Sequence, residues 1–247
     1  MSTPVSVAFR RLLGKDAKLV VRDRFLIGIV VYLVVLALVV RFGLPPVTRA
    51  LVRSTGFDLS SYYLLIGSVL AITATSLAGI LTGFLLLEEK EDRTLRALLV
   101  SPITLRTYLG YRMLAPMALG GLAVPAVVLI AGVAVPPLWP LAAIALVASL
   151  FGVITALFVP ATADDKITAF AMAKLLSGAS LIPVAAYFVR DPWQYLFGVY
   201  PPYWVFRAYW EASSVGVSWW LYLAAAVITH AIAIVALQRR LRTVMYR

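Results

Sequence analysis

The 247-residue sequence contains no cysteine, one histidine and only 11 acidic residues. Without cysteine, the chain can form neither a disulfide nor a thiolate metal site. Charged residues of either sign are also scarce, at 13% of the chain, whereas hydrophobic residues make up 62% and the mean hydropathy is +0.94. Such a composition excludes a water-soluble globular protein and indicates an integral membrane protein.

Six stretches with little or no charge follow one another along the chain, each 19 to 26 residues long. About 20 apolar residues are enough for a helix to cross a hydrocarbon core of roughly 30 Å. The sequence therefore predicts an all-α integral membrane protein with six transmembrane helices and no separate soluble domain. The predicted spans are residues 25–44, 62–87, 113–135, 138–159, 167–189 and 219–237, within a membrane domain at 25–237.

Both ends of the chain are basic. Residues 1–24 repeat apolar side chains at steps of three and four, with Lys and Arg on the other face, which is typical of an amphipathic helix lying on a membrane surface. A solvated basic tail is the alternative. The first span continues into Pro45 and Pro46 without a small-x-small cleavage site, so we interpret it as a permanent helix. Residues 238–247 form a short basic tail.

The placement of Lys and Arg predicts the orientation. With the amino terminus in the cytoplasm, 16 of the 22 basic residues fall on cytoplasmic segments and five on outer segments. This bias follows the positive-inside rule and predicts that both termini are cytoplasmic. Anionic membrane lipid accounts for the net charge of +11, and no inward loop interleaves basic and aromatic residues as a nucleic-acid site would.

The loop after the second predicted span carries a leucine pattern. Leu95, Leu98 and Leu99 fall at i, i+3 and i+4, so one helical turn would present an apolar stripe. Ser101 before Pro102 ends this helix, because a residue that precedes proline avoids the α region. The spacing is compatible with a helix that docks on another protein and also with leucines that dip into the lipid interface.

These residues resemble a known family. The run LLLEEKEDRTLRALLVSPITLRTYLGYR is similar to the loop after the second membrane helix of type-2 ATP-binding-cassette export permeases, although Arg93 stands where that family usually has Gly. The run YPPYWVFRAYW is placed like the Pro-aromatic run before their last helix, and the six-helix layout covers the whole chain. The matching loop residues are Glu88, Glu89, Glu91, Thr94, Leu95, Leu98, Leu99, Ser101 and Pro102.

The resemblance implies one permease half that pairs with a second half, identical or not, in a prokaryotic plasma membrane. ATP and Mg²⁺ would bind to separate nucleotide-binding subunits, and this chain would carry no cofactor. The chain indeed has no G-x-x-x-x-G-K-[ST] motif for a P-loop. Residues 91–100 would form the coupling helix on the ATPase. The coupling residues implied are Glu88, Glu91, Asp92, Arg93, Thr94, Leu95, Leu98, Leu99, Ser101 and Pro102.

Two details of the resemblance refine these expectations. FGLPP and PPYW resemble the subgroup of drug-export permeases for fluoroquinolones, which implies export of an amphipathic drug-like or lipidic compound. The acidic cluster of Glu88, Glu89, Glu91 and Asp92 is expected either to pair with basic residues of the leader or of the ATPase, or to be solvated.

Residues 193–216 are rich in aromatic side chains and precede the last span. Amphipathic rings favour the membrane interface, so an aromatic belt is one interpretation. The family resemblance implies instead a re-entrant pair of short helices that forms an outer gate and does not cross the membrane. The gate residues expected from it are Pro201, Pro202, Tyr203, Arg207 and Glu211.

Lys174 is the only Lys or Arg in the interior of a predicted span; the other basic residue within a span, Arg41, lies three residues before the outer end of the first. An intramembrane charge is a candidate for the translocation path and for substrate contact. It lies about 10 Å along the helix from Ile167, so a side chain that extends to the nearer membrane surface is the alternative. The single histidine, His230, is expected to be a packing residue, and no cluster of ligating side chains predicts a metal site.

The sequence gives weaker support for two other functions. A membrane-embedded enzyme acting on a phosphorylated lipid would use Asp164 and Asp165 to hold Mg²⁺, but two adjacent carboxylates without a third acid make a poor site. A secondary transporter would show buried ionisable residues or broken helices in symmetric halves, whereas the predicted spans hold one lysine and show no clear symmetry. We therefore expect a transport subunit that is not itself an enzyme.

Overall fold

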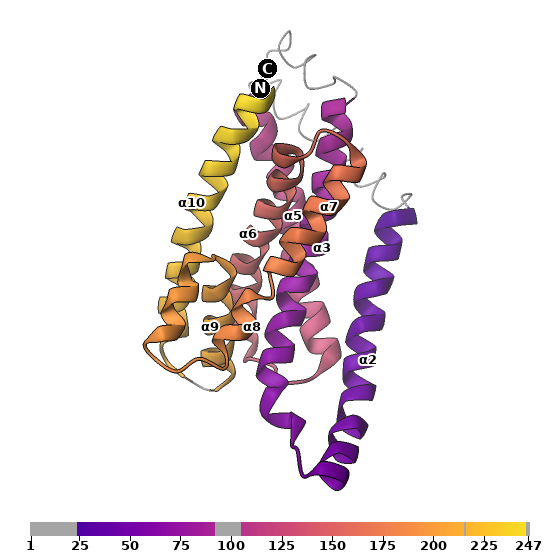
Figure 1. Ribbon diagram of the computed structural model, residues 1–247, viewed down its shortest axis with the longest axis vertical. Coiled ribbons are helices and arrows are strands. Elements are labelled where there is room, and N and C mark those ends of the chain that lie inside the picture. The colour runs from indigo at the N-terminus through magenta and orange to yellow at the C-terminus, as the bar shows by residue number, and fades with distance from the viewer. Residues whose placement is uncertain (1–23, 92–104, 215, 246–247) are drawn as a thin grey trace, which may run out of the picture.

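The computed structural model describes residues 24–91, 105–214 and 216–245 (Figure 1). Within these residues every regular element is a helix, and six segments are long and apolar enough to cross a membrane, which confirms the predicted all-α, six-helix fold. The predicted surface helix and most of the predicted coupling helix lie outside the described residues. The long helices are α2 (Arg24–Thr55), α3 (Tyr63–Glu91), α5 (Leu105–Ala131), α6 (Leu138–Thr162), α7 (Lys166–Ala179) and α10 (Trp219–Met245), and the short ones are η1 (Leu59–Tyr62), α8 (Ile182–Ala186), η3 (Trp193–Val199) and α9 (Pro202–Ser213).

The first long helix extends further than the predicted span at 25–44. α2 continues through Pro45 and Pro46 to Thr55, although each proline removes a backbone donor from the helix. This stretch also contacts α3. The Thr48 hydroxyl lies 3.0 Å from the hydroxyl of Tyr63, which begins α3. These contacts depend on the folded bundle and cannot be read from the local sequence.

The centre of the bundle is the contact between α3 and α6, the most extensive in the structure. Small residues bring the two backbones together: a Cβ atom added at Gly79 would lie 2.3 Å from the carbonyl oxygen of Gly152 and 2.7 Å from Cβ of Thr155. Close approach through small residues is how membrane helices gain packing contacts without a hydrophobic driving force. α5, α9 and α10 pack around this pair.

α2 lies at one edge of the bundle, apart from the central pair (Figure 1). It packs mainly on α5, with smaller contacts to α3 and η1, and most of its apolar side chains are exposed. Exposed apolar side chains on a membrane-length helix are in contact with lipid or with another subunit. The most exposed of them are Ile27, Val30, Val31, Tyr32, Val35, Val39, Phe42 and Val47.

The short elements gather at one end of the bundle, which we call the α9 end (Figure 1). The Ser213 hydroxyl donates to the carbonyl of Ala134 in the α5–α6 turn (3.2 Å), and the Tyr187 hydroxyl donates to the carbonyl of Ser61 (2.7 Å). Residues 187–213 therefore begin and end beside the same set of turns and do not cross the bundle. The opposite end, which we call the Lys90 end, holds the end of α3, the start of α5 and the α6–α7 connection.

Candidate functional site

The helices α2, α3 and α7 enclose a pocket of about 530 Å³ toward the Lys90 end. The sequence places Lys174 there on α7, eight residues after the helix begins, and thus about 12 Å along its axis. Its ammonium nitrogen lies 4.7 Å from the centre of the Phe170 ring, one turn earlier on the same helix. The pocket is lined by Gly28, Ile29, Tyr32, Leu77, Ile80, Phe170, Ala173, Lys174 and Ser177.

Residues 193–216, the predicted gate segment, fold into two short helices, η3 and α9, separated by Tyr200 and Pro201. Pro202 begins α9, where a missing backbone donor costs nothing because the first N–H groups of a helix have no partner inside it. Tyr203 is fully buried and stacks on Phe197 of η3. The indole nitrogen of Trp210 donates to the Ser68 hydroxyl of α3 at 3.0 Å, so α9 is fixed to the central pair of helices.

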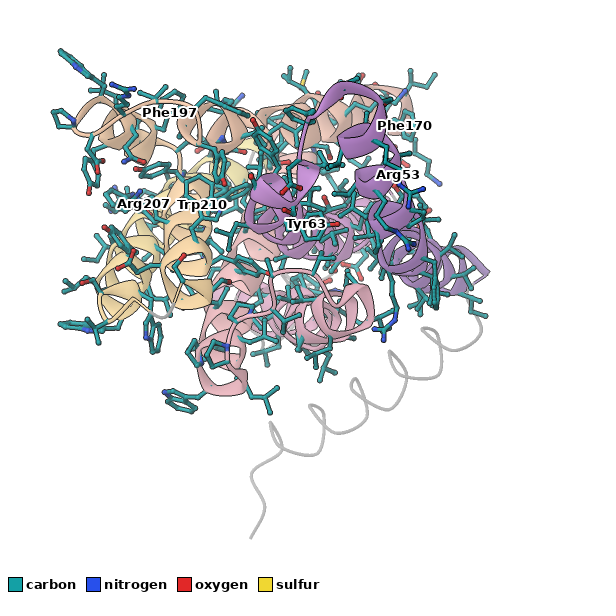
Figure 2. The ribbon with its side chains drawn as sticks, turned by 90° about the horizontal axis from the view of Figure 1, so that it is seen from below. Arg53, Tyr63, Phe170, Phe197, Arg207 and Trp210 are labelled. Carbon is teal, nitrogen blue, oxygen red and sulfur yellow. The ribbon has the colours of Figure 1, made fainter. Side chains whose placement is uncertain are left out.

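Arg207 joins three elements at the α9 end. Its guanidinium donates to the Gln194 side-chain oxygen of η3 (2.9 Å) and to the Tyr222 hydroxyl of α10 (2.9 Å), and it lies 4.9 Å from the centre of the Tyr222 ring. Glu211, one turn further along α9, lies instead against Gly216, where an added Cβ would meet its carboxylate at 2.3 Å. Figure 2 shows Arg207 and Trp210 on the side of the bundle opposite Arg53 and Phe170.

Ion pairs connect the helix ends at the Lys90 end. Lys166 pairs with Glu88 at 2.8 Å, and Glu89 pairs with Arg112 and accepts a hydrogen bond from Tyr108. Glu88 and Glu89 thus have partners on α7 and α5, whereas the sequence had suggested the leader, an ATPase or solvent. Of the other predicted coupling residues, Glu91 is exposed at the last position of α3. Asp92, Arg93, Thr94, Leu95, Leu98, Leu99, Ser101 and Pro102 lie outside the described residues.

Lys90 was not predicted to be important, yet it caps a helix. Its ammonium donates to the carbonyls of Pro160 (3.1 Å) and Ala163 (3.0 Å) at the end of α6 and to the Asp164 carboxylate (2.8 Å). A cation at a helix C-terminus stabilises carbonyls that have no partner inside the helix. Only its place beside a helix end that lies 70 residues later in the sequence reveals this role.

We expect Lys90→Met to destabilise the bundle by about 2 kcal/mol, because the substitution removes a charged donor from two carbonyls. The Lys90 side chain is only 17% exposed, whereas that of Asp164 is 90% exposed. Asp164→Asn therefore serves as the control, and its loss should stay below about 1 kcal/mol. Thermal unfolding of the two purified variants measures the difference, and equal shifts would mean that the ion pair alone accounts for the effect.

Asp164 and Asp165 were the residues of the enzyme alternative, and both have structural partners. Asp164 pairs with Lys90, as above. Asp165 is the N-cap of α7 and accepts hydrogen bonds from the Thr168 hydroxyl (2.7 Å) and from the backbone N–H groups of Thr168 and Ile167 (2.9 Å each). These bonds, led by that of the Thr168 hydroxyl, hold the pKa of Asp165 below its usual value. The carboxylates thus pair with a lysine and a helix N-terminus.

His230 lies in the middle of α10 and is fully buried. Its Nδ1 atom is 2.7 Å from the carbonyl oxygen of Ala226, one turn earlier, so this nitrogen carries the proton and donates it. The ring also meets Phe151 of α6 edge-on, with the centroids 6.4 Å apart. These contacts agree with the packing role expected from the sequence.

Sequence reasoning missed several residues that position the two regions. Except for Phe170, which lies one turn before Lys174, each makes its contact with a residue at least 13 positions away in the sequence. A lysine at the end of a predicted helix is a weak local signal for Lys90, and the others have no such signal. The missed residues are Ser68, Lys90, Tyr108, Phe170, Gln194 and Tyr222.

Six membrane-length helices, three of which line an open pocket, define a multi-pass membrane protein, and comparisons with known proteins identify it as a permease. The chain belongs to the family described as "Fluoroquinolones export permease protein Rv2686c-like", whose sequence pattern matches residues 16–238. It is 35% identical over 227 residues to the "Fluoroquinolones export permease protein Rv2686c" of Mycobacterium tuberculosis strain ATCC 25618 / H37Rv, across 90% of this chain and 88% of that relative. The same figures hold for the "Fluoroquinolones export permease protein MT2760" of strain CDC 1551 / Oshkosh.

This membership confirms the resemblance to export permeases that the coupling-loop and aromatic motifs indicated. The match covers residues 16–238 and not only the two motifs. The relatives are named permeases, and the chain is a multi-pass membrane protein of their family.

Proposed function

We propose that this chain is the membrane-spanning half of an ATP-binding-cassette exporter and is driven by separate ATPase subunits. The observation that carries the proposal is the family membership, which extends over nine-tenths of the chain to relatives named export permeases. A second permease half, identical or different, would complete the membrane part. ATP and Mg²⁺ would bind to the ATPase subunits.

The contacts at the Lys90 end support a coupling role for residues 91–100. This segment joins α3 to α5, and both flanking helices form ion pairs or hydrogen bonds with other helices close to it. Glu89 near the end of α3 pairs with Arg112 of α5, and Lys90 binds the end of α6. Glu88 pairs with Lys166 at the start of α7. A displacement of the coupling segment would therefore move four helix ends together.

The pocket around Lys174 supports a place for this residue on the translocation path. It lies between α2 and α7, and both helices expose apolar side chains around it, as Tyr32 and Phe170 do. A second permease half that covered these faces would enclose the pocket between the two halves. The cation would then face the path and not the lipid.

The α9 end supports an outer gate formed by residues 193–216. η3 and α9 lie across this end of the bundle, and Arg207 and Trp210 tie them to α10 and α3. Opening such a gate would break these hydrogen bonds and would uncover the buried apolar face of α9, while the six long helices stay intact. Tyr203 and Pro202, both buried, would move as part of α9.

The relatives are named for fluoroquinolones, so we propose that the cargo is an amphipathic drug of that kind, moved out of the cytoplasm or the inner leaflet. Vesicles that contain the permease with its ATPase subunit test this directly. ATP should drive fluoroquinolone transport in the exporting direction, and an ATPase subunit inactivated at its P-loop lysine should abolish it. A complex that hydrolyses ATP but moves no such compound would contradict the proposed cargo.

The expected orientation places both termini in the cytoplasm and the α9 end outside. Because the chain has no cysteine, single cysteines introduced at exposed sites report the side directly. Ser54→Cys and Val217→Cys, both at the α9 end, should react with an impermeant thiol reagent on intact cells. Thr243→Cys, near the end of α10, should react only after permeabilisation. Labelling of Thr243→Cys from outside would reverse the orientation.

A further inference from the structure

We infer that the pocket between α2, α3 and α7 binds a flat aromatic carboxylate, with the carboxylate on the Lys174 ammonium group and the ring system between Tyr32 and Phe170. This inference rests on the proposed function and names the class of ligand that this pocket takes. The negative charge of the ligand would be bound by one atom of the chain, Nζ of Lys174.

The positive charge of the pocket favours an anionic ligand. The other residues that line the pocket are apolar or neutral, so Lys174 supplies its only formal charge. Among the described residues Lys174 has neither an ion pair nor a hydrogen bond, and its ammonium group lies over the face of the Phe170 ring. A cation held only by an aromatic ring gains more from a carboxylate, because charge-assisted hydrogen bonds are about twice as strong as neutral ones. A bound carboxylate would displace no ion pair within the chain.

The single cation of the pocket favours a ligand with one negative charge over a ligand with two. Lysine is a single point charge with three donors, whereas groups with two negative charges, such as phosphate monoesters, are typically held by arginine forks or by several cations. The lining contains one lysine and no arginine. A singly charged carboxylate therefore suits this pocket better than a phosphorylated headgroup.

The volume and the aromatic lining of the pocket suit a flat ring system. The volume of about 530 Å³ lies within the range of small-molecule sites, roughly 300 to 1,000 Å³. Tyr32 of α2 and Phe170 of α7 line the pocket with aromatic side chains from two different helices, and Leu77 and Ile80 of α3 also line it. The small residues Gly28 and Ala173 leave room beside the rings, and a Cβ added at Gly28 would meet nothing within 4 Å. Aromatic walls favour a flat ring over a flexible acyl chain.

The position of the pocket makes it accessible from one leaflet of the membrane. Gly28 and Tyr32 lie in the first third of α2 and Phe170 in the first half of α7, so the pocket belongs to the half of the bundle near the Lys90 end. In the expected orientation this is the inner half of the membrane. An amphipathic acid that has partitioned into the inner leaflet reaches the pocket from the lipid side, with its charge near the headgroups.

Binding to the full-length permease, purified without ATPase subunits in nanodiscs of phosphatidylcholine, tests the inference. The probes are a fluoroquinolone and its ethyl ester, which differ in the charge of the carboxyl group. The wild-type chain should bind the acid about tenfold more tightly than the ester, a difference of about 1.4 kcal/mol. Lys174→Met should abolish this preference but change ester affinity less than about twofold, and Lys174→Arg should retain most of it.

Arg49→Met is the matched control, because Arg49 is an exposed cation on α2 near the α9 end and does not line the pocket. It should keep the full preference for the acid. Equal affinities for acid and ester in the wild-type chain, or an unchanged preference in Lys174→Met, would overturn the inference. Decanoic acid that competed as well as the aromatic acid would show that the pocket takes any amphipathic carboxylate and would overturn the aromatic assignment.

The outcome is separable from that of the proposed function. If ATP drives fluoroquinolone export but Lys174→Met leaves the preference for the acid intact, the pocket assignment fails and the exporter remains. If the permease shows the Lys174-dependent preference but no ATPase subunit drives transport, the binding site stands and the proposed function fails.

Discussion

Replacing both Leu95 and Leu98 with Asp should abolish recovery of the ATPase subunit with the permease and leave the membrane bundle folded. Full burial of a leucine at an interface is worth about 1.5 to 3 kcal/mol, so the pair contributes about 3 to 6 kcal/mol. Its loss should weaken assembly by more than about a hundredfold, and ATP-driven transport should be lost with it. Co-purification of the two subunits and the thermal unfolding of the permease alone measure the two effects separately.

The control for this pair uses the opposite face of the same predicted turns. Ala97 and Val100 lie about half a turn from the leucine stripe, and their replacement with Asp adds the same two charges. This variant should retain the ATPase subunit. If the leucine variant also retained it, the stripe would contact lipid and residues 91–100 would not be the docking helix.

Gly79→Val has the second large effect and should prevent the central pair of helices from packing. The added Cβ would lie 2.3 Å from a backbone oxygen of α6, and backbone cannot move aside as the end of a side chain can. Overpacking of a core costs typically 1 to 3 kcal/mol, and we expect about 3 kcal/mol or more here because α3 and α6 share the most extensive contact. Thermal unfolding of the detergent-solubilised permease measures this loss.

Gly121→Val is the matched control, because Gly121 is also inside a long helix but a Cβ there would meet nothing within 4 Å. The two substitutions carry the same change in helix propensity, which then cancels in the comparison. The control should lower stability by less than about 1 kcal/mol. Similar losses in both variants would show that the effect comes from helix propensity and not from the contact between α3 and α6.

The sequence predicted the six helices well because the membrane imposes a local rule. A backbone in hydrocarbon must bond internally, so each apolar stretch of sufficient length becomes a helix whatever its neighbours do. The helix ends follow no such rule. α2 continues through Pro45 and Pro46, and the stretch predicted as one span at 167–189 divides into α7 and α8, because contacts with other helices settle these details.

The candidate sites divide in the same way. Lys174 was recognisable in the sequence because a charge inside an apolar stretch is conspicuous on its own. Its surroundings were not, since Tyr32 and Leu77 reach the pocket from helices far away in the sequence. Arg207 was found through its aromatic segment, but one of its partners is Tyr222 of α10.

The sequence by itself therefore determined that this is a six-helix membrane permease of a drug-export family, because hydropathy, charge bias and short motifs are properties of consecutive residues. Only the tertiary structure decided how the ends of the helices are joined. Lys90 caps α6, and Glu88 pairs with Lys166, whereas the composition of the acidic cluster had suggested partners outside the membrane helices. An ion pair depends on which helix ends meet in space, and that is fixed by the packing of the whole bundle.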